Sequence, residues 1–184
     1  NFFISDKTPF LHFKKCFLFY RKEEKKMTRN QRIAIELLGM IRKGTEIHVD
    51  YGCLDDMVSL WCYKNSDVNV VHIFNHTPEK QSICLFNECK AIIESQKSNA
   101  EITRNQKLAI KLMHEIKSGM DIVIRYDCYI DQAEFCHGFL SDQLDMIDIR
   151  EYHINEQANN DFKKCLKIIE DVQKVGFGQP AFIF

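Results

Sequence analysis

The sequence has few of the residues that interrupt a folded core. Its 184 residues include only 7 Gly and 3 Pro, which excludes collagen-like and mucin-like chains. It has no uninterrupted apolar run of the ~18 residues that a membrane-spanning helix needs, because Lys14 and Lys15 divide the best candidate, residues 10–20. It also lacks an excess of charge of one sign: 25 basic and 26 acidic side chains leave a net charge of −1, which excludes an acidic-tail protein. With 45% hydrophobic residues, the composition is typical of a globular protein of one or two domains.

The chain has eight cysteines and no recognisable signal peptide. The lysine pair within residues 10–20 is incompatible with the apolar centre of a secretory signal. An even number of cysteines is compatible with disulfides, but a chain of this length can bury a core without them. We therefore expect a cytoplasmic protein with reduced thiols and no membrane contact. The cysteines are Cys16, Cys53, Cys62, Cys84, Cys89, Cys128, Cys136 and Cys165.

Residues 1–26 differ in composition from the rest of the chain. They contain six of the 14 Phe and carry seven basic and three acidic side chains, which leaves 18 basic and 23 acidic side chains in residues 27–184. Residues 21–26, directly before Met27, can be encoded by a purine-rich string that contains a bacterial ribosome-binding sequence. We interpret residues 1–26 as a translated leader and expect the natural protein to start at Met27. The alternative is a disordered, basic and aromatic N-terminal arm.

A four-residue sequence, Thr-Arg-Asn-Gln, occurs at residues 28–31 and again at residues 103–106. Further identities keep this spacing of 75 residues and, after a one-residue insertion, a spacing of 76. So many matches in one register predict a tandem duplication. The matched pairs include Ala34 and Ala109, Leu37 and Leu112, Ile41 and Ile116, Gly44 and Gly119, Tyr51 and Tyr126, Cys53 and Cys128, Asp56 and Asp131, Phe86 and Phe162, and Cys89 and Cys165.

Local patterns predict the same five elements in each repeat. Thr28 and Gln31 have capping-box spacing at the start of a helix, and an apolar period of about 3.6 residues follows them. Gly44 is expected to end this helix at the C′ position. Strict alternation over residues 46–51 then predicts a half-buried strand. The other expected elements are a second opening helix from 103, strands at 58–63, 68–74, 121–126, 133–139 and 144–150, and closing helices at 82–96 and 158–173.

The predicted fold class is α+β, a tandem duplication of an α-β-β-β-α unit. Residues 27–97 form repeat 1, residues 102–175 form repeat 2, and residues 176–184 form an apolar tail. Each repeat is expected to have an antiparallel three-stranded sheet with two helices on one face. A unit of about 70 residues buries little apolar surface alone, so we expect the repeats to pack on each other. The sequence leaves open whether their sheets merge.

The repeated Tyr-x-Cys-x-x-Asp motif supplies the candidate catalytic side chains. In an enzyme site, Cys53 or Cys128 would be a nucleophile beside an acid, but no paired His or Gly-rich elbow accompanies either one. We favour a structural interpretation, with the tyrosine in the core, the cysteine as a small buried side chain and the aspartate in a turn. No set of four convergent ligands is recognisable, so we expect no metal and no cofactor. The motif residues are Tyr51, Cys53, Asp56, Tyr126, Cys128 and Asp131.

Three side chains are candidates for contact with a partner. Trp61, the single tryptophan, has Cys136 as its counterpart in repeat 2 and is either an exposed anchor on the sheet or a cap on the contact between repeats. Arg29 and Arg104 are repeated, although a base in the first turn of a helix opposes the helix dipole. These arginines either bind a carboxylate or phosphate of a partner or have a local structural role, which is the interpretation we favour.

The order α-β-β-β-α is also that of the double-stranded-RNA-binding domain. Lys163, Lys164 and Lys167 in the closing helix of repeat 2 are similar to the basic helix start of that family. The resemblance covers only this helix and the element order, because repeat 1 has Asn-Glu-Cys-Lys-Ala at residues 87–91 and neither repeat has a Gly-Pro-x-His loop. Residues 27–184 are also acidic overall, whereas binding to phosphates needs a basic surface. We therefore do not expect nucleic acid as the partner.

These observations predict a small, non-enzymatic, intracellular protein that acts through protein contacts or regulation and is encoded by a bacterium, a phage or a mobile element. The prediction depends on a duplication without a catalytic constellation, an acidic body and Trp61. Two alternatives stay open. One is an RNA-binding protein with a degenerate double-stranded-RNA-binding topology, and the other is a thiol or metal enzyme that uses Cys53 or Cys128.

Overall fold

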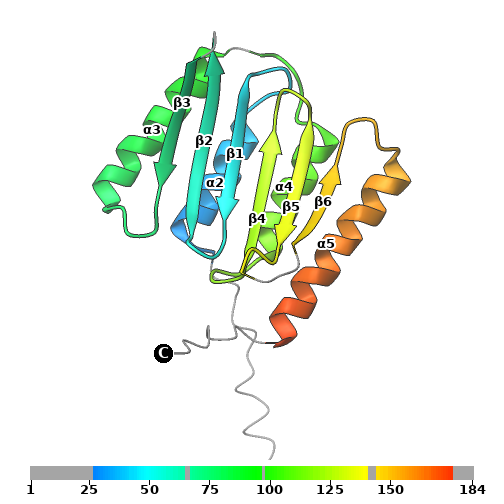
Figure 1. The fold of residues 1–184 in the computed structure, drawn as a ribbon. Helices are drawn as coiled ribbons and strands as arrows, with labels where there is room; N and C mark the ends of the chain where they lie inside the picture. Colours follow the sequence, from blue (N-terminus) through cyan, green and yellow to red (C-terminus); the bar gives the residue numbers. More distant parts are fainter. Residues whose placement is uncertain (1–26, 65–66, 97, 141–143, 176–184) are drawn as a thin grey trace, which may run out of the picture.

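The computed structural model describes residues 27–64, 67–96, 98–140 and 144–175. Within them the order α-β-β-β-α occurs twice along the chain (Figure 1). The predicted leader, residues 1–26, and the predicted tail, residues 176–184, lie outside the described residues. The elements are α2 (Arg29–Met40), β1 (Ile47–Gly52), β2 (Met57–Lys64), β3 (Asp67–Ile73), α3 (Glu79–Ser95), α4 (Arg104–Glu115), β4 (Ile122–Asp127), β5 (Gln132–His137), β6 (Asp145–Ile149) and α5 (Asn155–Val175).

The six described strands form one antiparallel sheet in the order β3-β2-β1-β4-β5-β6. β1 and β4, the first strands of the two halves, pair in its centre, with Asp50 opposite Arg125. The sequence predicts three strands in each repeat and leaves open whether the sheets merge; in the structure the three-stranded sheets are not separate but form one six-stranded sheet. The physical reason is that pairing β1 with β4 satisfies backbone groups that would otherwise form two further exposed sheet edges.

The described helices cover one face of this sheet (Figure 1). α2 contacts β1 and β2, α4 contacts β4 and β5, and α3 and α5 lie against β3 and β6. In β1, Val49 and Tyr51 are buried beneath the helices, whereas His48 and Asp50 point to the opposite face. No described helix covers that opposite face, which we call the open face. None of the described helices is both long and apolar enough to cross a membrane.

The two halves share one core between the helix layer and the sheet. α2 and α4 contact each other above the central pair of strands. Apolar side chains from both helices and from β1 and β4 therefore pack together, and burial of this kind is the main favourable term in folding. The largest fully buried side chains include Leu37, Leu38, Tyr51, Leu60, Leu112, Met113, Tyr126 and Phe135.

Both opening helices begin with the predicted capping box. In α2, the backbone N–H of Gln31 donates to Thr28 Oγ1 over 3.0 Å, and the backbone N–H of Thr28 donates to Gln31 Oε1 over 3.3 Å. Thr103 and Gln106 form the same pair of bonds at the start of α4. These bonds satisfy N–H groups that have no partner inside the helix, so the start of each helix is confirmed where the local sequence placed it.

The predicted helix ends are wrong. The helices end at Met40 and Glu115, and the next residue in each case is extended, so the glycines do not occupy the C′ position. Gly44 and Gly119 instead lie in the following turns with φ of 85° and 88°, a region that favours glycine. Their backbone N–H groups donate to carbonyl oxygens in the strand turns of the other half, over 3.1 and 3.0 Å. The repeated glycines thus shape turns that join the two halves.

Candidate functional site

The repeated Tyr and Asp form a hydrogen-bonded cluster with the Thr that begins each opening helix. Thr28 Oγ1 donates to Asp56 Oδ1 over 2.6 Å, and Tyr51 OH donates to the same oxygen over 2.9 Å. Asp56 has a φ of 44°, the left-handed conformation of a tight turn. Burial raises the pKa of Tyr51 above its ordinary value, so the phenol stays a donor. The same contacts join Thr103, Tyr126 and Asp131.

The repeated arginines bind loop carbonyls within their own half. The Arg29 guanidinium donates to the carbonyl oxygens of Phe74 and Thr77, over 3.0 and 2.9 Å, in the turn between β3 and α3. Arg104 makes the equivalent bonds in the turn between β6 and α5. These contacts give both side chains a local role, in which each one ties the start of an opening helix to a distant turn. Binding of a partner by Arg29 or Arg104 stays a prediction.

The two repeated cysteines are buried where the halves meet. Cys53 Sγ donates to the carbonyl oxygen of Lys117 over 2.6 Å, and Cys128 Sγ donates to that of Arg42 over 3.2 Å. Burial raises the pKa of Cys53 to about 12 and that of Cys128 to about 11. A cysteine nucleophile needs the opposite, a pKa lowered toward neutral pH. Their surroundings therefore favour the structural interpretation over the thiol-enzyme alternative.

The side chains assigned to the metal and RNA alternatives do not form a site of their own. In the part of the chain that the structure describes, no three His, Cys, Asp or Glu side chains are placed to hold a metal ion. Lys163, Lys164 and Lys167 are exposed on α5, which lies at the β6 edge in Figure 1. Lys164 Nζ donates to Asp161 Oδ1 over 2.8 Å, which neutralises part of this basic group. The three lysines thus form a small patch on a single helix.

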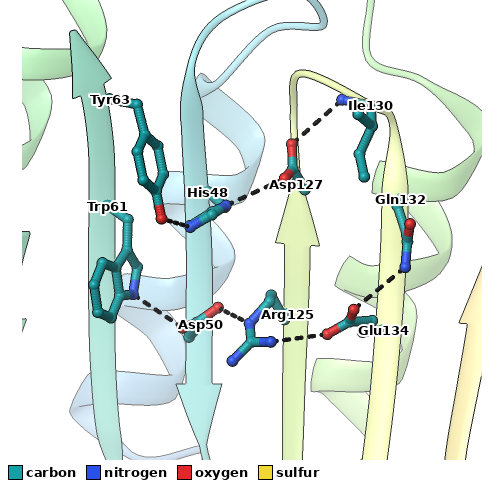
Figure 2. A pocket seen from close by; sticks show the side chains of 9 residues that line it. All are labelled: His48, Asp50, Trp61, Tyr63, Arg125, Asp127, Ile130, Gln132 and Glu134. Carbon is teal, nitrogen blue, oxygen red and sulfur yellow. Dashed lines mark hydrogen bonds and ion pairs between the residues drawn. The ribbon is translucent and has the colours of Figure 1, made fainter. Parts of the chain in front are cut away.

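The open face has a shallow hollow over the junction of β1 and β4, with a volume of about 320 Å³. Figure 2 shows that its floor comes from these two central strands and its sides from β2 and β5. The floor consists of paired polar side chains, and one side is aromatic. The lining residues are His48, Asp50, Trp61, Tyr63, Arg125, Asp127, Ile130, Gln132 and Glu134.

A chain of hydrogen bonds crosses the floor of the hollow from β2 to β5 (Figure 2). Trp61 Nε1 donates to Asp50 Oδ2 over 3.0 Å, and Arg125 Nε donates to Asp50 Oδ1 over 2.8 Å. Arg125 Nη1 then donates to Glu134 Oε2 over 3.0 Å, and Gln132 Nε2 donates to Glu134 Oε1 over 3.3 Å. Because both oxygens of each carboxylate are bonded, these contacts hold the side chains of four strands in fixed positions.

A second set of contacts forms the end of the hollow near the β4–β5 turn. His48 Nε2 lies 2.7 Å from Tyr63 OH, and His48 Nδ1 lies 3.3 Å from Asp127 Oδ2. Asp127 Oδ1 accepts the backbone N–H groups of Tyr129 and Ile130 over 2.8 and 3.3 Å. Burial alone would raise the pKa of Asp127, but the hydrogen bonds from His48 and from these N–H groups outweigh it and lower the pKa. Asp127 is therefore negatively charged at neutral pH.

Aromatic rings continue from the hollow to the outer strand β3. The Trp61 ring centroid lies 6.1 Å from that of His48 and 5.9 Å from that of His72. The rings of His72 and Phe74 are 5.9 Å apart, and those of Phe74 and His76 are 5.2 Å apart. Distances of this size are typical of favourable ring pairs. Trp61 thus lies on the open face, where it lines the hollow and contacts the aromatic rings that continue toward the edge of the sheet.

Most residues of the hollow are not identified by the sequence analysis, which singles out only Trp61. Alternation over residues 46–51 places His48 and Asp50 on one face of a strand, but it does not show what lies beside them. Arg125 and Asp127 join them because β1 pairs with β4. Local sequence patterns do not predict which strands pair when they are far apart in the sequence. The hollow could therefore not be predicted from the sequence.

Comparison of the chain with family models, with curated proteins and with solved structures finds no match.

Proposed function

We propose that this chain is a non-enzymatic protein-binding protein whose partner docks on the open face of the sheet. The observation that carries the proposal is the hollow between Trp61 and Glu134, on a face that no described helix covers. Among the described residues, the helices lie on one side of a large antiparallel sheet, and the other side is available for contact. The ordered side chains of the hollow lose little conformational entropy when a partner binds, which favours affinity.

The composition of this face supports binding of a protein. Trp, Tyr and Arg are the residues that contribute most often to the binding energy of protein interfaces. Trp61, Tyr63 and Arg125 line the hollow together, and the Arg125 side chain is 46% exposed. Val68 and Phe74 on and beside β3 are 52% and 38% exposed and extend the apolar area. An aromatic centre beside bonded polar groups is the usual arrangement of a protein-binding surface.

A tandem duplication of the α-β-β-β-α unit is part of this proposal. The element order and the cluster of Thr, Tyr and Asp occur in both halves, and so do the arginine contacts and the thiol bonds. The aromatic side of the hollow belongs to the first half, since the chain has a single Trp. We infer that both copies kept the shared architecture and that the residues of the open face diverged between them, with the aromatic side in the first half and Arg125, Asp127 and Glu134 in the second. A cytoplasmic location and a bacterial, phage or mobile-element source stay predictions.

The remaining alternatives receive less support from the geometry. RNA binding would depend on Lys163, Lys164 and Lys167, of which Lys164 already contacts Asp161. The hollow itself contains three carboxylates and would repel phosphates. A thiol enzyme would need a cysteine with a lowered pKa, whereas burial raises the pKa of both repeated cysteines.

The test compares capture of proteins from a host lysate by the full chain and by two open-face variants, Trp61→Ala and Tyr63→Ala. Lys111→Ala on the exposed side of α4 is the matched control. Circular dichroism and urea unfolding identify the variants that keep the fold. We expect proteins that the wild type and Lys111→Ala retain but that folded Trp61 or Tyr63 variants lose. No retained protein, or equal retention by all variants, would overturn the proposal.

A further inference from the structure

The hollow has more acidic than basic side chains. Three carboxylates, those of Asp50, Asp127 and Glu134, line it together with one guanidinium, that of Arg125. Arg125 is bound between Asp50 and Glu134 over 2.8 and 3.0 Å, so its charge is already compensated on both sides. The surplus is negative, and it lies in a depression whose walls exclude part of the solvent, where electrostatic contacts are stronger than in open water.

Asp127 is the one of these three carboxylates that does not pair with Arg125. Its contacts are His48 Nδ1 at 3.3 Å and two backbone N–H groups, and in the described ranges no Lys or Arg lies within ion-pair distance of it. Its side chain is 27% exposed and so is accessible from the hollow. The backbone bonds to Oδ1 fix its position, and Oδ2, which contacts only His48, has a lone pair for a further donor. An incoming ammonium or guanidinium group would find a preformed acceptor here.

The aromatic side of the hollow is suited to the same ligand. Trp61 and Tyr63 line the hollow on the side opposite Ile130 (Figure 2). A tryptophan or tyrosine ring attracts a cation through its negative face. The four-carbon stem of a lysine can pack on apolar atoms such as those of Ile130 while its charged end reaches a carboxylate. An acidic or phosphorylated segment would instead bring its charge next to Asp127 and Glu134.

We propose that the hollow binds a lysine or arginine side chain presented by a basic segment of the partner protein. The cationic group lies against Trp61 and Tyr63 and pairs with Asp127, and Glu134 adds attraction from the other side. This inference rests on the proposed function, because it names the chemistry of the partner that docks on the open face.

Trp61 provides a direct readout, because it is the only tryptophan in the chain. The full chain is titrated with octalysine and, separately, with octaglutamate, while Trp61 emission and the anisotropy of labelled peptide are recorded. We expect a saturable change with octalysine that weakens as salt is added, since exposed charges are screened. Octaglutamate should cause no saturable change. Equal or tighter binding of octaglutamate, or no binding of octalysine, would overturn the inference.

Variants locate the binding site. Asp127→Asn keeps an acceptor for the backbone N–H groups but removes the charge, and we expect it to weaken octalysine binding about five- to tenfold. Glu134→Gln should weaken binding less and serves as the second variant if Asp127→Asn does not fold. Glu170→Gln, an exposed carboxylate on α5, is the matched control and should bind like the wild type. Equal loss in the control and in both hollow variants would contradict the assignment.

The two proposals fail in different ways. If lysate capture depends on Trp61 but octalysine does not bind, the open face is a docking surface for a partner of other chemistry and only this inference is wrong. If octalysine binds through Asp127 but capture does not depend on Trp61 or Tyr63, the cation site stands and the proposed function is wrong.

Discussion

Asp50 and Arg125 lie directly opposite each other on β1 and β4, and Arg125 Nε donates to Asp50 Oδ1 over 2.8 Å. These residues occupy matching positions in the two predicted repeats, 75 residues apart. Two identical charged residues at this position would place like charges face to face at the centre of the sheet, which is destabilising. The difference between the repeats therefore creates an ion pair where a copy of the same residue would create repulsion.

Reversing the charge of Arg125 tests this relationship. Arg125→Asp places a second carboxylate opposite Asp50 and should lower the free energy of unfolding by about 1 kcal/mol. Arg125→Gln, which removes the attraction without adding repulsion, should lower it less. The double variant Asp50→Arg/Arg125→Asp should recover part of the loss, although it removes the acceptor of Trp61 Nε1. Urea unfolding measures all four proteins, and a double variant no more stable than Arg125→Asp would contradict a direct pairing.

Gln31 and Gln106 make crossed contacts between the opening helices. Gln31 Nε2 donates to the carbonyl oxygens of Met113 and, over 3.3 Å, of Ile116 at the end of α4. Gln106 Nε2 makes the same contacts at the end of α2, with a distance of 3.1 Å to Ile41 O. The last carbonyls of a helix have no partner within it, so each helix closes the end of the other.

Replacement of either glutamine should therefore destabilise the fold. Gln31→Met keeps the side-chain length but leaves buried carbonyls without a donor, which should cost about 1–3 kcal/mol in the free energy of unfolding. Gln106→Met should cost a similar amount because its contacts are equivalent. Gln81→Met on the exposed side of α3 is the control and should change stability little. If urea unfolding gave all three variants the same midpoint, the crossed bonds would carry no net stability.

Thiol reactivity should separate buried from exposed cysteines. Burial raises the pKa of Cys53 and Cys165 to about 12 and that of Cys128 to about 11, so these thiols stay protonated at pH 8. Cys84 is exposed on α3. Among the cysteines that the structure describes, we expect iodoacetamide to label Cys84 first and the buried ones only after unfolding, as followed by peptide mass spectrometry. Rapid labelling of native Cys53 or Cys128 would restore the thiol-enzyme alternative.

Asp127 should contribute to the acid sensitivity of the protein. Its pKa in the folded chain lies below the ordinary value of 3.8, so its contribution to stability is complete above that pH and disappears as the pH falls through the lowered pKa. The wild type should therefore lose more unfolding free energy than Asp127→Asn between about pH 5 and pH 2. Urea unfolding at several pH values measures the difference. A parallel pH dependence of the two proteins would mean that Asp127 is not stabilised as a charge.

The helix starts and the strand faces could be predicted because they depend on neighbours in the sequence. Thr28 and Gln31 form a capping box within four residues, and the alternation of Val49 and Tyr51 with His48 reports which face of a strand is buried. The helix ends were not predicted correctly. Gly44 has a positive φ, as a helix terminus would require, but it lies in a later turn and its N–H group donates to the other half.

The hollow could be predicted only in part for the same reason. Trp61 is a candidate from the sequence because it is the single tryptophan and lies on an alternating strand. Its hydrogen bond to Asp50 and the pairing of Asp50 with Arg125 depend on strand register, which the sequence does not give. The repeated motif residues are visible in the sequence because both halves carry them, and in the structure they form the same hydrogen bonds twice. The residues of the open face differ between the two halves, and so no internal match revealed them.

By itself, the sequence determined the local elements of this protein, the matching order of its two halves and the structural character of its repeated side chains, because caps, periods and turns act over a few residues. The tertiary structure alone decided that β1 pairs with β4, that Gln31 and Gln106 close each other's helices, and that one face of the resulting sheet has an acidic and aromatic hollow. Each of these features needs atoms about 75 residues apart to meet. Only the packing of two helices on one continuous sheet brings them together.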